Sequence, residues 1–100
     1  MYEKKYANTK EISKLVALLG KEGIPFELRG FLLDNELSIQ VISPSIDHWK
    51  IDAVCHAFSY GGEQGLIEIM MPADDVLYDG VDGYLTAEKA LEYFKKALKA

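Results

Sequence analysis

Apolar residues recur at helical spacing near both ends of the chain. The first stripe comprises four residues at i, i+3, i+4 and i+7, namely Ile12, Leu15, Val16 and Leu19. Asn8 is placed to cap a helix at this point, because Glu11 follows it in capping-box register. Pro25 blocks continuation of the same helix. We therefore predict a helix over residues 9–22.

The second stripe lies at the C-terminal end and comprises Leu91, Phe94 and Leu98. Thr86 is placed as the N-cap of this segment, and Leu85 and Ala90 form a hydrophobic staple around it. Glutamates come first and lysines last along the segment, which matches the polarity of a helix dipole. These features predict a C-terminal helix that begins after Thr86.

Alternating apolar and polar residues predict strands in the first half of the chain. Residues 26–33 alternate up to Gly30, where we expect a β-bulge. Asp34-Asn35-Glu36 follows as a plausible hairpin turn. Residues 37–41 then place three apolar side chains on one face of a second strand, which ends at Ser43-Pro44-Ser45.

The segment from Ile46 to Phe58 fits two periods. Its apolar residues alternate as in a strand, but four of them also stand at helical spacing, namely Ile51, Val54, Cys55 and Phe58. The length of the segment, its two alanines and the Gly61-Gly62 pair that follows favour a helix, with Asp47 as its cap. We predict a helix over residues 47–58.

The remaining segments complete the predicted fold. Residues 66–71 are apolar at nearly every position, which is typical of a central strand covered on both faces, and residues 72–85 form an acidic loop. The predicted fold is a two-layer α+β domain in which a small sheet of about three strands packs with helices, in the order α-β-β-α-β-α. The whole chain, residues 1–100, forms one domain, with residues 1–7 as a candidate flexible N-terminal extension.

Composition narrows the class of protein. The chain is 49% hydrophobic and 27% charged, which is typical of a globular domain rather than of a disordered segment. No apolar run approaches the roughly 18 residues that span a bilayer, and the charged start does not resemble a signal peptide. The single cysteine, Cys55, cannot form an internal disulfide or a multi-cysteine zinc site. We predict a cytoplasmic location.

The acidic residues are concentrated in one part of the chain. The formal net charge is -5, yet residues 1–50 are balanced, whereas residues 51–88 hold eight carboxylates and no lysine or arginine. A block of this kind repels phosphate backbones, so we expect no direct contact with nucleic acid through it. A solvated acidic loop that aids solubility and a surface that meets a basic partner are both consistent with this pattern.

Two motifs in the second half of the chain resemble those of a known group of proteins. The run from Ser59 to Met70, SYGGEQGLIEIM, and the run from Gly83 to Glu88, GYLTAE, resemble SYG-x-E-Q-x-L-[LI]-E-I-M and G-[YW]-L-T-A-E. These motifs occur in an uncharacterised family of small proteins encoded by phages and prophages of Gram-positive bacteria. The resemblance covers residues 50–95. It implies a genomic context, that of a phage or prophage in a bacterial host, but no activity.

The best candidate for a binding site is the segment Tyr60-Gly61-Gly62-Glu63-Gln64. Its glycines, together with Gly65, allow a ligand to approach the backbone closely, and Tyr60 offers an aromatic face. The alternative is a tight turn with a purely structural role. Glu68, on the following strand, is a further candidate, since a partly buried carboxylate must find a hydrogen-bond donor or change its pKa.

Other residues with chemical potential are better explained structurally. On a helix, His48, Asp52 and His56 would stand in line over two turns, so one metal ion could not bind both histidines. Cys55 lies on the apolar stripe and is predicted to be a buried structural thiol. The aspartates of residues 74–82 lack the order of a calcium loop. We therefore predict no metal and no cofactor.

These observations lead to one predicted function and two alternatives. The chain is predicted to be a small non-catalytic binding protein of phage or prophage origin, which counteracts host defence by engaging a host protein or a small signalling molecule. It is expected to bind neither nucleic acid nor membranes. The alternatives are a homodimeric structural or assembly accessory protein and an enzyme that uses Glu68 with His48 or His56.

Overall fold

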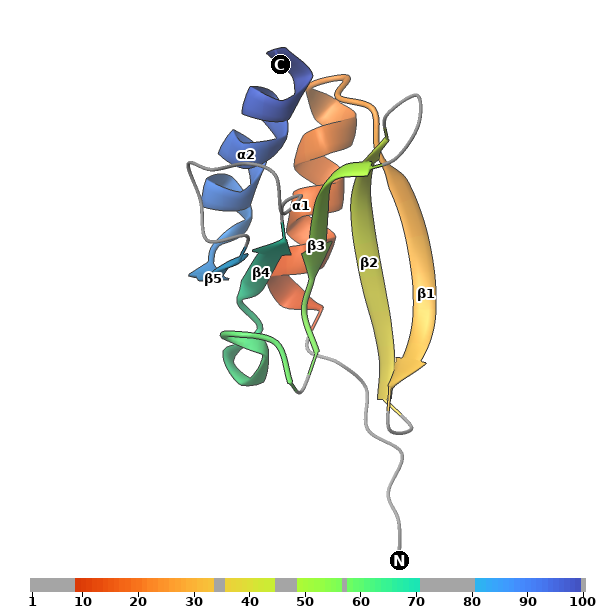
Figure 1. The fold of residues 1–100 in the computed structure, drawn as a ribbon, viewed down its shortest axis with the longest axis vertical. Coiled ribbons are helices and arrows are strands. Elements are labelled where there is room, and N and C mark those ends of the chain that lie inside the picture. Colours follow the sequence, from red (N-terminus) through yellow and green to blue (C-terminus); the bar gives the residue numbers. More distant parts are fainter. Residues whose placement is uncertain (1–8, 34–35, 45–48, 57, 71–80, 100) are drawn as a thin grey trace, which may run out of the picture.

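A computed structural model describes residues 9–33, 36–44, 49–56, 58–70 and 81–99. A five-stranded antiparallel sheet, with strands in chain order, is flanked in sequence by two helices that pack on it (Figure 1). In chain order the elements are α1 (Lys10–Lys21), β1 (Glu27–Leu33), β2 (Glu36–Pro44), β3 (Trp49–Val54), the short 3-10 turn η1 (Gly62–Gln64), β4 (Ile67–Met70), β5 (Val81–Leu85) and α2 (Ala87–Lys99).

The structure corrects the predicted order of elements. The prediction of about three strands in the order α-β-β-α-β-α is wrong, although the fold is still a small α+β fold. The first and last helices are confirmed to within two residues of the predicted starts and ends that are described. The expected bulge at Gly30 is absent, since the pairing of β1 with β2 runs without a shift across that residue.

The predicted helix over residues 47–58 is replaced by strand β3. Ile51, Ala53 and Cys55 are all buried in the core, which is the two-residue period of a strand. Ala53 pairs with Val41 on one side and Ile69 on the other, directly beneath the helical layer. The alanine that favoured a helix locally instead serves as a small residue where α2 packs on β3.

Strand β5 lies within the predicted loop of residues 72–85. It contains Asp82 and Gly83, which are depleted in strands, so its sequence gives little sign of a strand. It forms by pairing with β4, with a register shift between Ile67 and Ile69. Tertiary pairing therefore decides the state of this segment. Residues 71–80 lie outside the described residues.

The core lies between the sheet and the helices. Side chains of the central strands meet the apolar stripes of both helices in one cluster, and Phe94, Ile12, Leu15 and Leu19 are its largest fully buried helical members. Ala87 and Ala90 are also fully buried, and their small size lets α2 approach its neighbours closely. The predicted apolar faces are thus confirmed for the side chains that the structure describes, which in α2 are those of Leu91 and Phe94 but not that of Leu98.

The two helices run in the same direction side by side (Figure 1). Lys14 on the first half of α1 pairs with Glu88 at the start of α2, with 2.7 Å between Nζ and Oε1. Glu22, directly after α1, pairs at 3.2 Å with Lys95 in the second half of α2. The first ion pair is about half exposed and the second partly exposed, so both contribute little stability, but their order along the chain establishes the parallel arrangement.

Glu11 links the start of α1 to the start of α2. Its side chain is only 8% exposed, and Oε1 accepts a hydrogen bond of 2.8 Å from the backbone N–H of Ala87. The predicted capping of its own helix is not what this carboxylate does: the N-cap of α1 is Thr9, without a side-chain hydrogen bond, and Asn8 lies outside the described residues. Glu11 satisfies one of the N–H groups that every helix leaves open at its N-terminus.

Neither described helix combines the length and the apolar composition that crossing a membrane requires.

Substitution of Glu11 tests this link between the helices. We expect Glu11→Ala to lower the free energy of unfolding by about 1–3 kcal/mol, because it leaves the buried N–H of Ala87 without an acceptor. Glu11→Gln retains a carbonyl oxygen at the same place and should cost clearly less. Urea denaturation of the three proteins measures both effects, and equal losses for the two variants would contradict this role of the acceptor.

Candidate functional site

The two sequence motifs, far apart in the chain, lie against each other. The N–H of Tyr84 donates a hydrogen bond of 3.1 Å to the carbonyl oxygen of Tyr60. A Cβ placed on Gly83 would lie 2.3 Å from the Cβ of Tyr60, and one placed on Gly61 would lie 2.9 Å from the Cα of Tyr84. The loop before β4 and strand β5 are therefore in backbone contact, and only glycine fits at these two points.

The loop of residues 59–65 requires glycine for its conformation as well. Gly61 and Gly65 have φ angles of 88° and 78°, in the left-handed region, on either side of the turn η1. Tyr84 also has a positive φ of 56°, which is uncommon for a residue with a side chain. Its hydrogen bond to Tyr60 and the close packing of Gly83 hold it in that conformation.

Side chains below the loop fix its position. The hydroxyl of Ser59 donates to the carbonyl oxygen of His56 and accepts from the N–H of the same residue, both at 2.9 Å. Glu68, 9% exposed on β4, accepts a hydrogen bond of 3.1 Å from the N–H of Tyr60. The buried thiol of Cys55 contacts the carbonyl oxygen of Gly62 at 3.7 Å. Ser59, Glu68 and Cys55 therefore each bind the backbone of the loop or of His56 before it and hold the loop in place.

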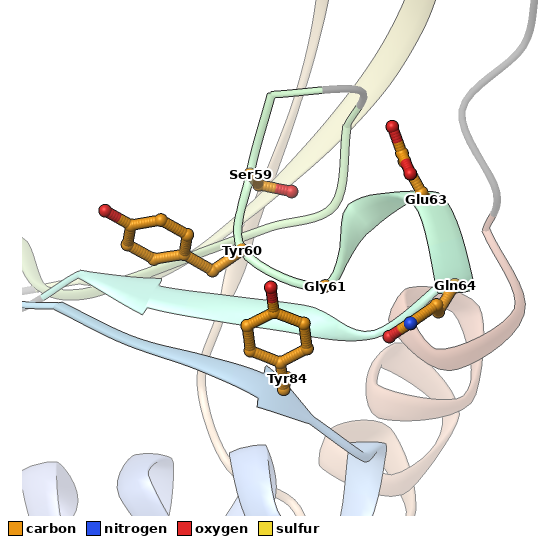
Figure 2. A pocket seen from close by; sticks show the side chains of 6 residues that line it. All are labelled: Ser59, Tyr60, Gly61, Glu63, Gln64 and Tyr84. Carbon is orange, nitrogen blue, oxygen red and sulfur yellow. The ribbon is translucent and has the colours of Figure 1, made fainter.

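This frame presents two tyrosine rings to solvent. Tyr60 is 58% exposed and Tyr84 is 61% exposed, although the N–H and C=O of Tyr60 and the N–H of Tyr84 are hydrogen-bonded. Figure 2 shows the two rings on the same side of the β4–β5 pair, with the ring of Tyr84 between Tyr60 and Gln64. We call Tyr60, Gly61, Gly83 and Tyr84 the tyrosine ledge.

Two shallow hollows flank the tyrosine ledge and share Tyr84. The first has a volume of about 280 Å³ and is lined by Ser59, Tyr60, Gly61, Glu63, Gln64 and Tyr84. The second has a volume of about 420 Å³ and is lined by Asp82, Gly83, Tyr84, Leu85, Lys89, Glu92, Tyr93 and Lys96. Because Tyr84 stands between them, its ring can contact a group bound in either hollow.

The charges around the hollows are mixed. Three carboxylates and two lysines line the hollows. Two of the carboxylates have partners: Asp82 accepts a hydrogen bond from the hydroxyl of Tyr93, and Glu92 lies 3.9 Å from Lys95. Lys96 lies over the ring of Tyr93, 5.9 Å from its centre. The hollows thus offer aromatic faces, hydroxyls and an amide, without the excess of cations that binds phosphate groups.

Most of the predicted site residues meet at this place. Tyr60, Gly61, Glu63 and Gln64 line the first hollow, whereas Gly62 is buried beneath it. Glu68 does not face the hollow but supports Tyr60 from below.

Sequence analysis missed Tyr84 as a site residue, although the motif containing it was recognised. Its neighbour Gly83 gave no usable signal, because a glycine indicates a close backbone approach only within a strand, and residues 72–85 were predicted to form a loop.

The catalytic alternative gains no support from the geometry. The described oxygen contact of Glu68 is to a backbone N–H, and His56 uses Nδ1 to accept a hydrogen bond of 3.1 Å from the N–H of Phe58. His48 lies outside the described residues. The line of His48, Asp52 and His56 on one helix does not exist, since Asp52 is on β3, and the described residues contain no cluster of potential metal ligands.

The sheet face opposite the helices carries a second group of polar residues. Asp52 accepts a hydrogen bond of 2.7 Å from Nε2 of Gln40, while its other oxygen is buried without a partner among the described residues. Burial raises the pKa of this carboxyl above its ordinary value of 3.8, and the charge of Glu68 acts in the same direction, against the hydrogen bond from Gln40. Arg29, on β1, pairs with Glu27 and does not line the tyrosine ledge.

Comparison of the chain with protein-family models, with curated proteins and with solved structures gives no match.

Two glycine substitutions test how tightly the loop is packed. A Cβ on Gly62 would lie 1.7 Å from the carbonyl oxygen of His56, so we expect Gly62→Ala to lower the free energy of unfolding by more than about 2 kcal/mol. Gly20→Ala, in α1 with open space around it, is the matched control and should raise stability by about 0.5–1 kcal/mol. Chemical denaturation measures both; a neutral Gly62→Ala would contradict the packing.

Asp52 predicts a dependence of stability on pH. Because its folded pKa lies above its unfolded one, the folded state binds more protons between the two values, and stability falls as pH rises from about 3.8 through the raised pKa. Asp52→Asn keeps an acceptor for Gln40 and removes this loss. The variant should therefore be more stable than the wild type at neutral pH, with the difference vanishing below about 3.8; parallel curves of urea midpoint against pH would contradict it.

Proposed function

We propose that this chain is a non-catalytic binding protein whose contact surface is the tyrosine ledge, and that its partner is another protein. The observation that carries the proposal is the pair of exposed rings of Tyr60 and Tyr84. Their backbones are hydrogen-bonded to each other, and the rings lie beside two hollows. Natural binding surfaces use tyrosine in this way, because the side chain supplies a large contact area and loses little conformational freedom on binding.

The rigidity of the frame supports binding rather than a merely structural turn. A turn that only connected β3 to β4 would not need backbone contact with β5, yet Gly61 and Gly83 bring the two segments together and leave Tyr60 and Tyr84, one from each segment, turned to solvent. Binding is favoured when the contact groups are fixed before the partner arrives, since less entropy is lost.

The charge of the site favours a protein over a nucleotide signal. A pocket for a phosphate-bearing molecule needs cations directed at it, and here carboxylates outnumber lysines around the two hollows. Arg29 lies on β1 at the opposite edge of the sheet, so it does not supply a cation to these hollows. A shallow, mixed surface with exposed aromatic rings is typical of contact with a folded protein.

The biological setting of the proposal rests on the resemblance of the two motifs to those of phage and prophage proteins of Gram-positive bacteria. In that setting the partner is a protein of the host, and binding it counteracts host defence. The backbone contact between the two motifs supports treating them as one functional unit.

Purification of the tagged chain from infected Gram-positive cells, followed by native mass spectrometry, tests the proposal. We expect a complex with a host protein for the wild type. Tyr60→Ala and Tyr84→Ala should each weaken that complex by about thirtyfold or more, the effect of losing a central aromatic contact. Tyr60→Phe and Tyr84→Phe keep the rings and should weaken it much less.

Phe58→Ala is the matched control, because Phe58 is an exposed aromatic residue directly before the loop of residues 59–65 and lines neither hollow. Its complex should form as the wild type does. A chain that is recovered without a partner, or a complex that the two alanine variants leave intact, would overturn the proposal.

A further inference from the structure

The two edges of the sheet differ in how they are protected from pairing with another strand. Natural edge strands are kept short, bulged, charged or interrupted, since an open edge pairs with any strand that fits it. Strand β5 has such features: it is five residues long, its pairing contains a register shift, and it includes Asp82 and the left-handed Tyr84.

Strand β1, at the other edge, carries the charged residues Glu27 and Arg29 but is neither short nor interrupted. It is seven residues long, contains no proline or lysine, and pairs with β2 without a shift from Glu27 to Leu33. Figure 1 shows it as the outermost strand, and it has no substantial contact with either helix. Leu28 and Leu32 are 54% and 68% exposed on it, the latter being the most exposed large apolar side chain described.

The backbone groups at this edge point outward at every second residue. Only two residues separate Leu33 from its partner Glu36, so this pair is of the hydrogen-bonded kind, and the kinds alternate along the ladder. The N–H and C=O groups of Leu28, Gly30 and Leu32 are therefore directed away from β2. These three residues present the hydrogen-bonding edge.

The strand is symmetric about its midpoint, Gly30. If a second copy of β1 lies antiparallel to the first with the two Gly30 residues opposite each other, all seven residues of each strand are paired. Leu28 of one copy then faces Leu32 of the other, twice. A Cβ on Gly30 would have open space around it. The two glycines therefore leave room between the two Leu28–Leu32 pairs, in which the four leucine side chains can contact one another.

The opposite face of β1 is compatible with the same register. Arg29 would face Phe31 of the second copy, an arrangement in which a guanidinium contacts an aromatic ring. Each Arg29 already has Glu27 of its own chain at 3.7 Å, which offsets the charge of the second Arg29 nearby. No like charges lie directly opposite each other.

From this complementarity we propose that the chain forms a homodimer by antiparallel pairing of β1 with β1 of a second copy, centred on Gly30, to give a continuous ten-stranded sheet. The surface differs from the tyrosine ledge and does not depend on its function. Because β5 is at the opposite edge, the dimer carries one tyrosine ledge at each end, both accessible. A partner that offers two sites would then be bound with a gain in avidity.

Sedimentation velocity over a range from low to high micromolar concentration tests the proposal. One strand pair with four leucines is a small interface, so we expect a dimer with a dissociation constant of roughly micromolar order. The double variant Leu28→Lys/Leu32→Lys changes only exposed side chains and should raise that constant by more than about tenfold. Gly30→Pro, which removes an outward N–H, should do the same.

Val81→Lys, at the β5 edge, is the matched control and should leave the dissociation constant unchanged. The register is tested separately with the single variants Arg29→Cys and Phe31→Cys, which should form a covalent dimer under oxidising conditions when mixed but not when either is alone, since position 29 faces position 31 only in the register centred on Gly30. A wild-type chain that is monomeric at every concentration, a dimer insensitive to the leucine substitutions, or a mixture of the two cysteine variants that stays uncross-linked would each overturn the proposal.

Discussion

The contact between the loop of residues 59–62 and strand β5 is the constraint on which the site depends. It requires that no side chain project from Gly61 or Gly83, because a Cβ on either would lie less than 3.0 Å from the tyrosine of the opposite segment. Where these backbones touch, the N–H of Tyr84 donates a hydrogen bond to the carbonyl oxygen of Tyr60, and both rings project to solvent. Exposure of the tyrosines is a consequence of backbone packing.

The same contact joins the site to the rest of the fold. Strand β5 leads directly into α2, whose first N–H group is bound by Glu11 of α1, so the position of Tyr84 is tied to the packing of the two helices. On the other side, Glu68 ties the loop to β4 within the sheet. A binding surface made in this way is rigid because its supports are the core elements themselves, and not because the loop is intrinsically stiff.

The two edges of the sheet differ because the helices do not cover the sheet evenly. The helices lie over the later strands, where they cover the core, and strand β1 extends beyond them (Figure 1). One edge is therefore occupied by the tyrosine ledge and interrupted by a register shift, while the other is long and regular. In the proposed arrangement the regular edge joins two copies and the irregular edge meets the partner.

The sequence by itself determined the elements whose pattern has a single interpretation. The stripes of α1 and α2, the alternation in β1 and β2 and the apolar run of β4 each agree with the structure, because their periods or lengths admit one element only. Segments with two interpretations were decided by tertiary contacts: Ala53 and Cys55 fit a helix equally well until Val41 and Ile69 pair with β3 from both sides. The chemistry of glycine and tyrosine identified Tyr60–Gln64 as a binding candidate, but it did not identify Tyr84, the other exposed tyrosine of the site. Tyr84 is more than twenty residues away in the chain, and only the pairing of β5 with β4, which its own sequence does not favour, brings it beside Tyr60.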